Sequence, residues 1–200
     1  MTFSGAKFLL FDSVGDAWPK VGFPQVAFAG RSNVGKSSLL NALTGGARLA
    51  RVSNTPGRTR GIVLFEAGGC FAFADLPGYG FAKVSRSERE AWKLLVEGYL
   101  SGCKKLLQVY ILVDLRRGPG EDDRLLAEYL ATYSIPYRWV GTKADKLSSR
   151  ELSVALAAFS GKPWLDAGGE VIWTSTRTKA GIDRLRNEVR AVFHSDAGGR

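Results

Sequence analysis

Eight residues near the start of the chain have the types and spacing of a phosphate-binding loop. They read Gly30-Arg31-Ser32-Asn33-Val34-Gly35-Lys36-Ser37, and Ser38 follows them. The two glycines let the backbone curl so that successive N–H groups point at a phosphate, and the start of the following helix adds partial positive charge. Lys36 can reach the β- and γ-phosphates, and the Ser37 hydroxyl can ligate Mg²⁺. The spacing therefore predicts a site for a nucleoside triphosphate and magnesium.

A second motif, Asp75-Leu76-Pro77-Gly78, ends a short apolar run further along the chain. An aspartate at a strand end can hold Mg²⁺ through water, and the Gly78 N–H can approach a γ-phosphate closely because glycine has no side chain. The pattern DxxG alone occurs often by chance. Its place at the end of an apolar strand, after the phosphate loop, makes it significant.

The third motif, Thr142-Lys143-Ala144-Asp145, follows another apolar run. The Asp145 carboxylate can accept hydrogen bonds from the two N–H groups on the Watson–Crick edge of guanine, and the Lys143 stem can lie along the base. Adenine lacks that donor pair and would leave the acid unpaired, which discriminates steeply. An isolated KxD is more often a surface ion pair, but its order after the other motifs favours GTP and GDP as ligands.

Two segments of weaker pattern complete the predicted site. Thr174-Ser175-Thr176 ends the last apolar run and can either cover the base with backbone N–H groups or form a simple turn. Residues 47–61 form a basic, turn-rich segment that we expect to be a mobile loop. Within it we favour Thr59 over Thr55 as the second magnesium hydroxyl, because flanking glycines let the loop fold over the γ-phosphate. The contact residues expected there are Gly57, Arg58, Thr59, Arg60 and Gly61.

The elements that must position these motifs alternate along the chain. Apolar runs predict strands at residues 26–29, 62–66, 71–74, 106–113, 137–140 and 170–174. Helical periodicity predicts helices that begin near residues 38, 87, 125, 149 and 182. This order implies a three-layer α/β fold, with a mostly parallel sheet of about six strands flanked by helices on both faces. We expect one domain over residues 24–194, a peripheral leader at 1–23 and a frayed tail at 195–200.

The charge points to a polyanionic partner. Lysine and arginine number 28 against 19 acidic residues, a formal net charge of +9. Nucleic acid is the first candidate, an acidic membrane surface the second, and a merely soluble basic surface the alternative. One basic set surrounds the predicted switch loops: Arg48, Arg51, Arg58, Arg60, Lys83, Arg86, Arg89 and Lys93. Tyr79 and Phe81 could add stacking surfaces for bases, although Phe81 is equally suited to the core. A second set on the last helix is Arg184, Arg186 and Arg190.

Composition excludes several other classes of protein. No apolar run approaches the ~20 residues of a membrane span, and the start of the chain lacks a signal-peptide pattern. The two cysteines and the single His194 have no metal-ligand spacing. We therefore expect a cytoplasmic protein, a monomer with no membrane partner.

At this point the motif set resembles that of the EngB-type (YihA/YsxC) GTPases, in the class that includes Era and MnmE. The most specific parts are Thr55-Pro56-Gly57-Arg58-Thr59, the run Asp75-Leu-Pro-Gly-Tyr-Gly80, and a threonine opening the base-reading motif. Asp114-Leu115-Arg116 also resembles the family's strand-end pattern. The resemblance implies the P-loop GTPase fold, magnesium ligation by Ser37 and Thr59, and a GTPase needed for assembly of the large ribosomal subunit, in a family linked to cell division.

The catalytic set predicted from these motifs is Lys36, Thr59, Gly78 and Asn33. Ras-like enzymes place a glutamine directly after DxxG to orient water, but here that residue is Tyr79. Asn33 resembles the asparagine that helps hold K⁺ near the phosphates in related bacterial GTPases, and a loop-shaping role is its alternative. Arg58 and Arg60 can act in cis or contact RNA. Two functions remain: a slow GTPase acting as a switch on ribosomal RNA and large-subunit precursors, or a GTP-dependent RNA clamp with incidental hydrolysis.

Overall fold

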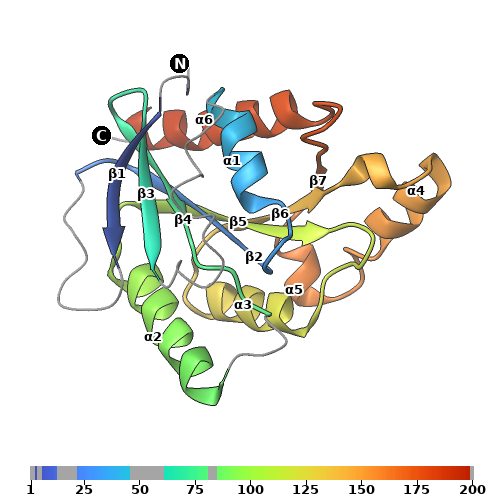
Figure 1. The fold of residues 1–200 in the computed structure, drawn as a ribbon, viewed down its shortest axis with the longest axis horizontal. Helices are drawn as coiled ribbons and strands as arrows, with labels where there is room; N and C mark the ends of the chain where they lie inside the picture. The colour runs from blue at the N-terminus through green and yellow to red at the C-terminus, as the bar shows by residue number, and fades with distance from the viewer. Residues whose placement is uncertain (1–2, 4–5, 13–21, 46–60, 81–84, 199–200) are drawn as a thin grey trace.

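The computed structural model describes residues 3, 6–12, 22–45, 61–80 and 85–198. Seven strands form one sheet in the order β1-β3-β4-β2-β5-β6-β7 (Figure 1). Their bounds are β1 Lys7–Asp12, β2 Gln25–Gly30, β3 Ile62–Ala67, β4 Phe71–Asp75, β5 Leu106–Asp114, β6 Tyr137–Thr142 and β7 Ile172–Trp173. The five strands from β4 to β7 in this order pair in parallel, whereas β3 is antiparallel to both of its neighbours.

Helices cover both faces of the sheet, as the alternating pattern predicts. They are α1 Lys36–Thr44, α2 Arg86–Gly102, α3 Glu121–Thr132, α4 Ser149–Ala157, α5 Pro163–Asp166 and α6 Ile182–Gly198. Figure 1 shows α1 and α6 on one face and α2, α3 and α5 on the other. Strand β5 divides the two cores: Tyr110 and Leu112 face α1 and α6, and Val109, Ile111 and Val113 face the opposite core. Its continuous apolar run follows from burial on both faces.

The β3–β4 hairpin is confirmed and closes next to Gly68 and Gly69. Both glycines have positive φ, at 66° and 76°, a conformation that favours glycine over other residues. The hairpin places the end of β4 beside β2, with Phe28 in register with Asp75. The DxxG motif is thereby delivered to the strand end that carries the phosphate loop.

Three parts of the fold differ from the sequence prediction. Residues of the expected leader form the edge strand β1, and Phe3 is 2% exposed against the core. Helix α6 continues through Gly198, beyond the expected boundary at residue 194. The capping box of α2 is made by Ser85 and Glu88, so the helix is capped two residues before the expected Ser87. Local patterns missed β1 because an edge strand needs only a partner, here β3, and little apolar alternation of its own.

Candidate nucleotide-binding site

The predicted motifs meet at one edge of the sheet. Gly30, Asp75, Asp114 and Thr142 are the last residues of β2, β4, β5 and β6, and Thr174 follows β7 directly. Ligands in open α/β sheets bind outside the carboxyl ends of parallel strands. Five separate segments of the chain thus contribute to one candidate site.

The phosphate loop connects β2 to α1 as the glycine spacing predicts. A Cβ on Gly30 would stand 2.8 Å from the Leu112 carbonyl oxygen of β5, so only glycine fits this crossing. Gly35 has φ of 108° immediately before α1, and no side-chain cap covers the helix start there. The first turn of α1, with Lys36, Ser37 and Ser38, therefore presents backbone N–H groups to an anion.

Lys36 and Asp75 contact each other directly at the centre of the site. The Lys36 ammonium forms an ion pair with Asp75 Oδ1, and the two side chains are only 13% and 3% exposed. The contact brings the predicted phosphate ligand and the predicted magnesium residue together at the start of α1. A carboxylate and the Ser37 hydroxyl are hard oxygen donors, which suits Mg²⁺.

The DxxG segment lies against the phosphate loop. The Ser32 N–H donates to the Tyr79 carbonyl oxygen at 2.9 Å, and the Leu76 N–H donates to the Phe28 carbonyl oxygen at 3.0 Å. A Cβ on Gly78 would stand 2.9 Å from Ser32 Oγ, so glycine is required for this approach. The Pro77 carbonyl accepts from the Trp92 indole of α2 at 2.7 Å. Movement of this segment would therefore displace α2 through this hydrogen bond.

Tyr79 is buried and does not offer a stacking surface for bases, so that prediction is wrong. Its hydroxyl donates to Asp123 Oδ1 at 2.5 Å, and the same carboxylate accepts from the Gly120 N–H at 2.8 Å. Burial, followed by the nearby Asp123 carboxylate, raises the pKa of Tyr79 well above its ordinary value. Burial also raises the pKa of Asp123. The Arg31 guanidinium lies beside Gly80 and Gly120, toward the start of α3.

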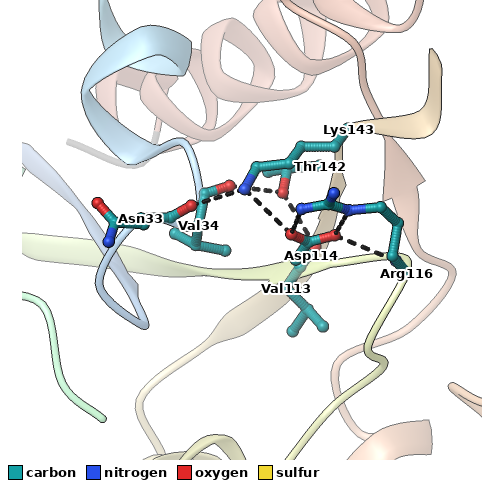
Figure 2. Close-up of polar contacts among 7 residues, drawn as sticks. All are labelled: Asn33, Val34, Val113, Asp114, Arg116, Thr142 and Lys143. Atoms are coloured by element: carbon teal, nitrogen blue, oxygen red, sulfur yellow. Dashed lines mark hydrogen bonds and ion pairs between the residues drawn. The ribbon is translucent and has the colours of Figure 1, made fainter. Parts of the chain in front are cut away.

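The opening threonine of the base-reading motif ties β6 to the phosphate loop. The Thr142 hydroxyl is within hydrogen-bonding distance of the Val34 carbonyl at 2.7 Å and the Val113 carbonyl at 3.2 Å. Figure 2 shows this residue behind the Lys143 side chain, which extends from β6 toward the loop. A buried hydroxyl in this place fixes the distance between the phosphate-binding and base-binding segments.

Lys143 bridges the phosphate loop and the end of β5 (Figure 2). Its ammonium donates to the Asn33 carbonyl oxygen at 2.7 Å and lies 3.0 Å from Asp114 Oδ2. Arg116 donates to both oxygens of the same carboxylate, at 2.9 and 2.6 Å. Burial alone would raise the pKa of Asp114, but the hydrogen bonds from Arg116 and Lys143 hold it well below its usual range. Sequence reasoning found Asp114 only by resemblance, and the structure gives its contacts.

Asp145 is held by the segment that follows β7. The Ser175 hydroxyl donates to Asp145 Oδ1 at 2.7 Å and lowers the pKa of the carboxyl. The Ser175 N–H donates to the Ala180 carbonyl, and the Ala144 N–H donates to Thr174, at 2.9 and 3.1 Å. The Ser175 backbone therefore closes a turn, while its hydroxyl orients the acid. Thr176 is half-buried in the same turn.

Several predicted residues lie outside the part of the chain that the structure describes: Arg48, Arg51, Thr55, Gly57, Arg58, Thr59, Arg60, Phe81 and Lys83. Gly61 is described and is buried directly before β3. Asn33 has φ of 63°, a left-handed conformation that asparagine tolerates. Its side-chain amide points away from Lys143 in Figure 2.

The three arginines of the second basic set, Arg184, Arg186 and Arg190, all make contacts within the protein. Arg184 pairs with Glu170 at 2.8 Å, and Arg186 pairs with Asp183 while also donating to the Ala42 carbonyl at 2.9 Å. The second interaction holds α6 to the last turn of α1. The guanidinium groups of Arg184 and Arg186 therefore form ion pairs and helix contacts. Arg190 lies over the Phe3 ring.

Across the part of the chain placed by the structure, no cluster of three or more His, Cys, Asp or Glu side chains could hold a metal ion. None of its helices is both long enough and apolar enough to cross a membrane.

Comparison with known proteins identifies the family of this chain. The family described as 50S ribosome-binding GTPase matches residues 25–143. The chain is 43% identical over 188 residues to a GTP-binding protein EngB of Desulfosudis oleivorans, covering 92% of both chains. It is 38% identical to the Bacillus subtilis EngB, covering 90% of this chain and 92% of that one.

The similarity extends to a solved structure. The crystal structure of an EngB GTP-binding protein superposes with a TM-score of 0.70 at 26% identity, covering 86% of this chain and 99% of that one. Sequence and fold therefore indicate the same family. The chain belongs to the EngB family of GTP-binding proteins and is a P-loop GTPase.

Proposed function

We propose that this GTPase acts as a nucleotide-dependent switch in assembly of the large ribosomal subunit. The observation that carries the proposal is the match to a family described by 50S ribosome binding. The formal charge of +9 supports an RNA partner, because Lys and Arg side chains neutralise phosphates. We infer that it works in the cytoplasm as a monomer, with residues 24–194 as its nucleotide-binding domain and without a membrane partner. The link to cell division stays a prediction.

The phosphate end of the site would act through Lys36, Gly78 and a magnesium ion. We infer that Ser37, Thr59 and, through water, Asp75 hold Mg²⁺, which would neutralise charge on the β- and γ-phosphates. Lys36 would exchange its Asp75 partner for phosphate oxygens, leaving the carboxylate to serve the metal. Asn33 is the proposed K⁺ residue, since Tyr79 is buried and supplies no Ras-type amide. The base end would use Asp145, oriented by Ser175.

The coupling of nucleotide to RNA would run through α2. Pro77 of the DxxG segment accepts a hydrogen bond from Trp92, and Arg89 and Lys93 are exposed on the same helix. Lys93 has only a loose pairing with Glu97, at 3.7 Å. A γ-phosphate that draws Gly78 toward it would shift the start of α2, and with it the position of these charges. This contact supports a switch in which RNA binding depends on bound nucleotide.

Single-turnover GTP hydrolysis, measured with and without purified large ribosomal subunits, tests the proposal. We expect subunits to change the hydrolysis rate, and the GTP-bound protein to crosslink to ribosomal RNA more than the GDP-bound protein. GTP-dependent crosslinking without any change in rate would favour the RNA clamp. Equal crosslinking with both nucleotides would refute the switch.

A further inference from the structure

The Ser32 hydroxyl is buried in the phosphate loop without a hydrogen-bond partner. Among the described residues, three buried side-chain polar atoms lack one: Ser32 Oγ, Tyr110 Oη and Arg190 Nε. Tyr110 lies in the core on β5, next to β2 and stacked on Phe28, and Arg190 packs on Phe3. Only the Ser32 atom belongs to a loop that binds a ligand.

Its surroundings explain why the hydroxyl is covered. The Ser32 N–H donates a hydrogen bond to the Tyr79 carbonyl oxygen at 2.9 Å, and this bond holds the DxxG segment against the loop. Ser32 Oγ then lies 2.9 Å from the place where a Cβ of Gly78 would stand. The hydroxyl therefore touches the residue whose N–H is the proposed γ-phosphate sensor.

A buried hydroxyl without a partner costs free energy, so its presence in a native protein calls for an explanation, and a catalytic role is one such explanation. Alanine would fill nearly the same space at this position without that cost. The acceptor that a GTP-loaded loop brings next to Gly78 is a γ-phosphoryl oxygen. The Tyr79 hydroxyl, the other nearby side-chain donor, already donates its hydrogen bond to Asp123.

We propose that Ser32 is a further catalytic residue, whose hydroxyl donates a hydrogen bond to a γ-phosphoryl oxygen of bound GTP. In hydrolysis the water oxygen bonds to the γ-phosphorus while the bond to the β–γ bridging oxygen breaks. The electron pair leaves with GDP, and the water proton ends on inorganic phosphate. Ser32 keeps its own proton and stabilises charge on the equatorial oxygen as the transition state forms.

The inference rests on the γ-phosphate role proposed for Gly78, but it needs no ribosome. Purified Ser32→Ala protein should bind GDP normally and bind GTP about tenfold more weakly, with single-turnover hydrolysis about tenfold slower. Thermal unfolding of nucleotide-free Ser32→Ala should occur at the same or a higher temperature, because an unpaired hydroxyl has been removed. In ³¹P spectra, the γ-resonance of bound GppNHp should move while the α-resonance stays.

A matched control is Ser153→Ala. Ser153 is exposed on α4 and its hydroxyl donates to the Ser149 carbonyl within the helix, so nucleotide affinity and rate should stay at wild-type values. Equal loss of GTP and GDP affinity in Ser32→Ala, with a lower unfolding temperature, would show a structural role and overturn the inference. An unchanged rate and GTP/GDP ratio would overturn it too. Wild-type protein that failed to distinguish GTP from GDP would instead refute the γ-phosphate role of Gly78 and Ser32 together.

Discussion

Single residues at this site act mainly by holding one another in place. Asp145 is oriented by the Ser175 hydroxyl, Lys143 by Asp114 and the Asn33 carbonyl, and Thr142 by two carbonyl oxygens. These partners lie at the ends of three other strands, β2, β5 and β7. Because these side chains are already ordered before a ligand binds, binding loses less conformational entropy.

Asp145→Asn tests the base-reading contact. The change replaces an acceptor of two guanine N–H groups by an amide, and hydrogen bonds to charged groups contribute about 1.5–3 kcal/mol each. We expect GTP affinity to fall by about 3 kcal/mol, roughly 150-fold, with a relative gain for xanthosine triphosphate. Isothermal calorimetry with both nucleotides measures this.

Ser175→Ala is the matched comparison for Asp145→Asn, because it removes only the hydroxyl that orients the carboxylate. GTP affinity should fall by about 1 kcal/mol, the usual size of one hydrogen bond, and the preference for guanine over xanthine should remain. Unchanged nucleotide preference in Asp145→Asn would remove Asp145 from the base site.

Asp114→Asn should make part of the pH dependence of stability disappear. The pKa of Asp114 is lowered in the folded protein by Arg116 and Lys143, so its unfolded pKa, ~3.9, is the higher one. Its stabilising contribution is therefore complete above about pH 5 and is lost as the pH falls below ~3.9 toward the folded pKa. Urea unfolding of wild type and variant from pH 3 to 7 should show a difference that shrinks toward acid. A difference that stayed constant across this range would contradict the assignment.

At the scale of elements, the DxxG segment is fixed to three neighbours. It contacts the phosphate loop through Ser32, α2 through Trp92, and the start of α3 through Tyr79 and Asp123. The Tyr79 ring also packs edge-on to Trp92, with centroids 5.5 Å apart. Any movement of this segment would therefore reach two helices on one face of the sheet.

Tyr79→Phe should weaken this attachment. The buried Asp123 carboxylate would lose a hydrogen bond, which costs about 1–3 kcal/mol of unfolding free energy. Because burial raises the pKa of Asp123, this carboxylate takes up a proton at a higher pH in the fold than in the unfolded chain, and the loss should shrink as the pH falls through the folded pKa. Chemical denaturation at pH 5 and pH 8 checks both points.

Tyr133→Phe is the control for Tyr79→Phe, since Tyr133 directly follows α3 and is 59% exposed. Its unfolding free energy should stay within about 0.5 kcal/mol of wild type. A Tyr79→Phe protein as stable as this control would mean that the Asp123 contact contributes nothing to the fold.

At the scale of the whole molecule, the start of the chain is part of the folded core. The Phe3 ring packs against Phe73 of β4 and Phe193 of α6, with centroids 5.1 and 6.3 Å apart. Arg190 of α6 covers the same ring at 5.7 Å. Residues that looked like a leader thereby join the central sheet to the last helix.

Phe3→Ala should therefore be costly for so early a residue. Large-to-small changes at buried phenylalanines lower the unfolding free energy by about 3–5 kcal/mol. Phe8→Ala, at a ring that is 47% exposed on β1, should cost much less. Thermal and urea unfolding of the two variants compare them directly, and equal stabilities would show that the N-terminal segment is not anchored by Phe3.

The sequence determined the motifs, their order and the α/β alternation, because these depend on local chemistry. Gly30 and Gly35 predict a loop whose backbone curls at these two positions. The apolar run of β5 predicts a strand buried on both faces. The guanine-reading role predicted for Asp145 also rests on residue type and position along the chain.

The tertiary structure decided which side chains have partners. Nothing local distinguishes Tyr79 as a residue bound to Asp123, which lies 44 residues further along the chain. The unpaired Ser32 hydroxyl and the Lys143–Asp114 contact belong to the same class. These facts depend on segments that are far apart in sequence and meet only when parallel strands end at the same edge of the sheet, so no local pattern could contain them.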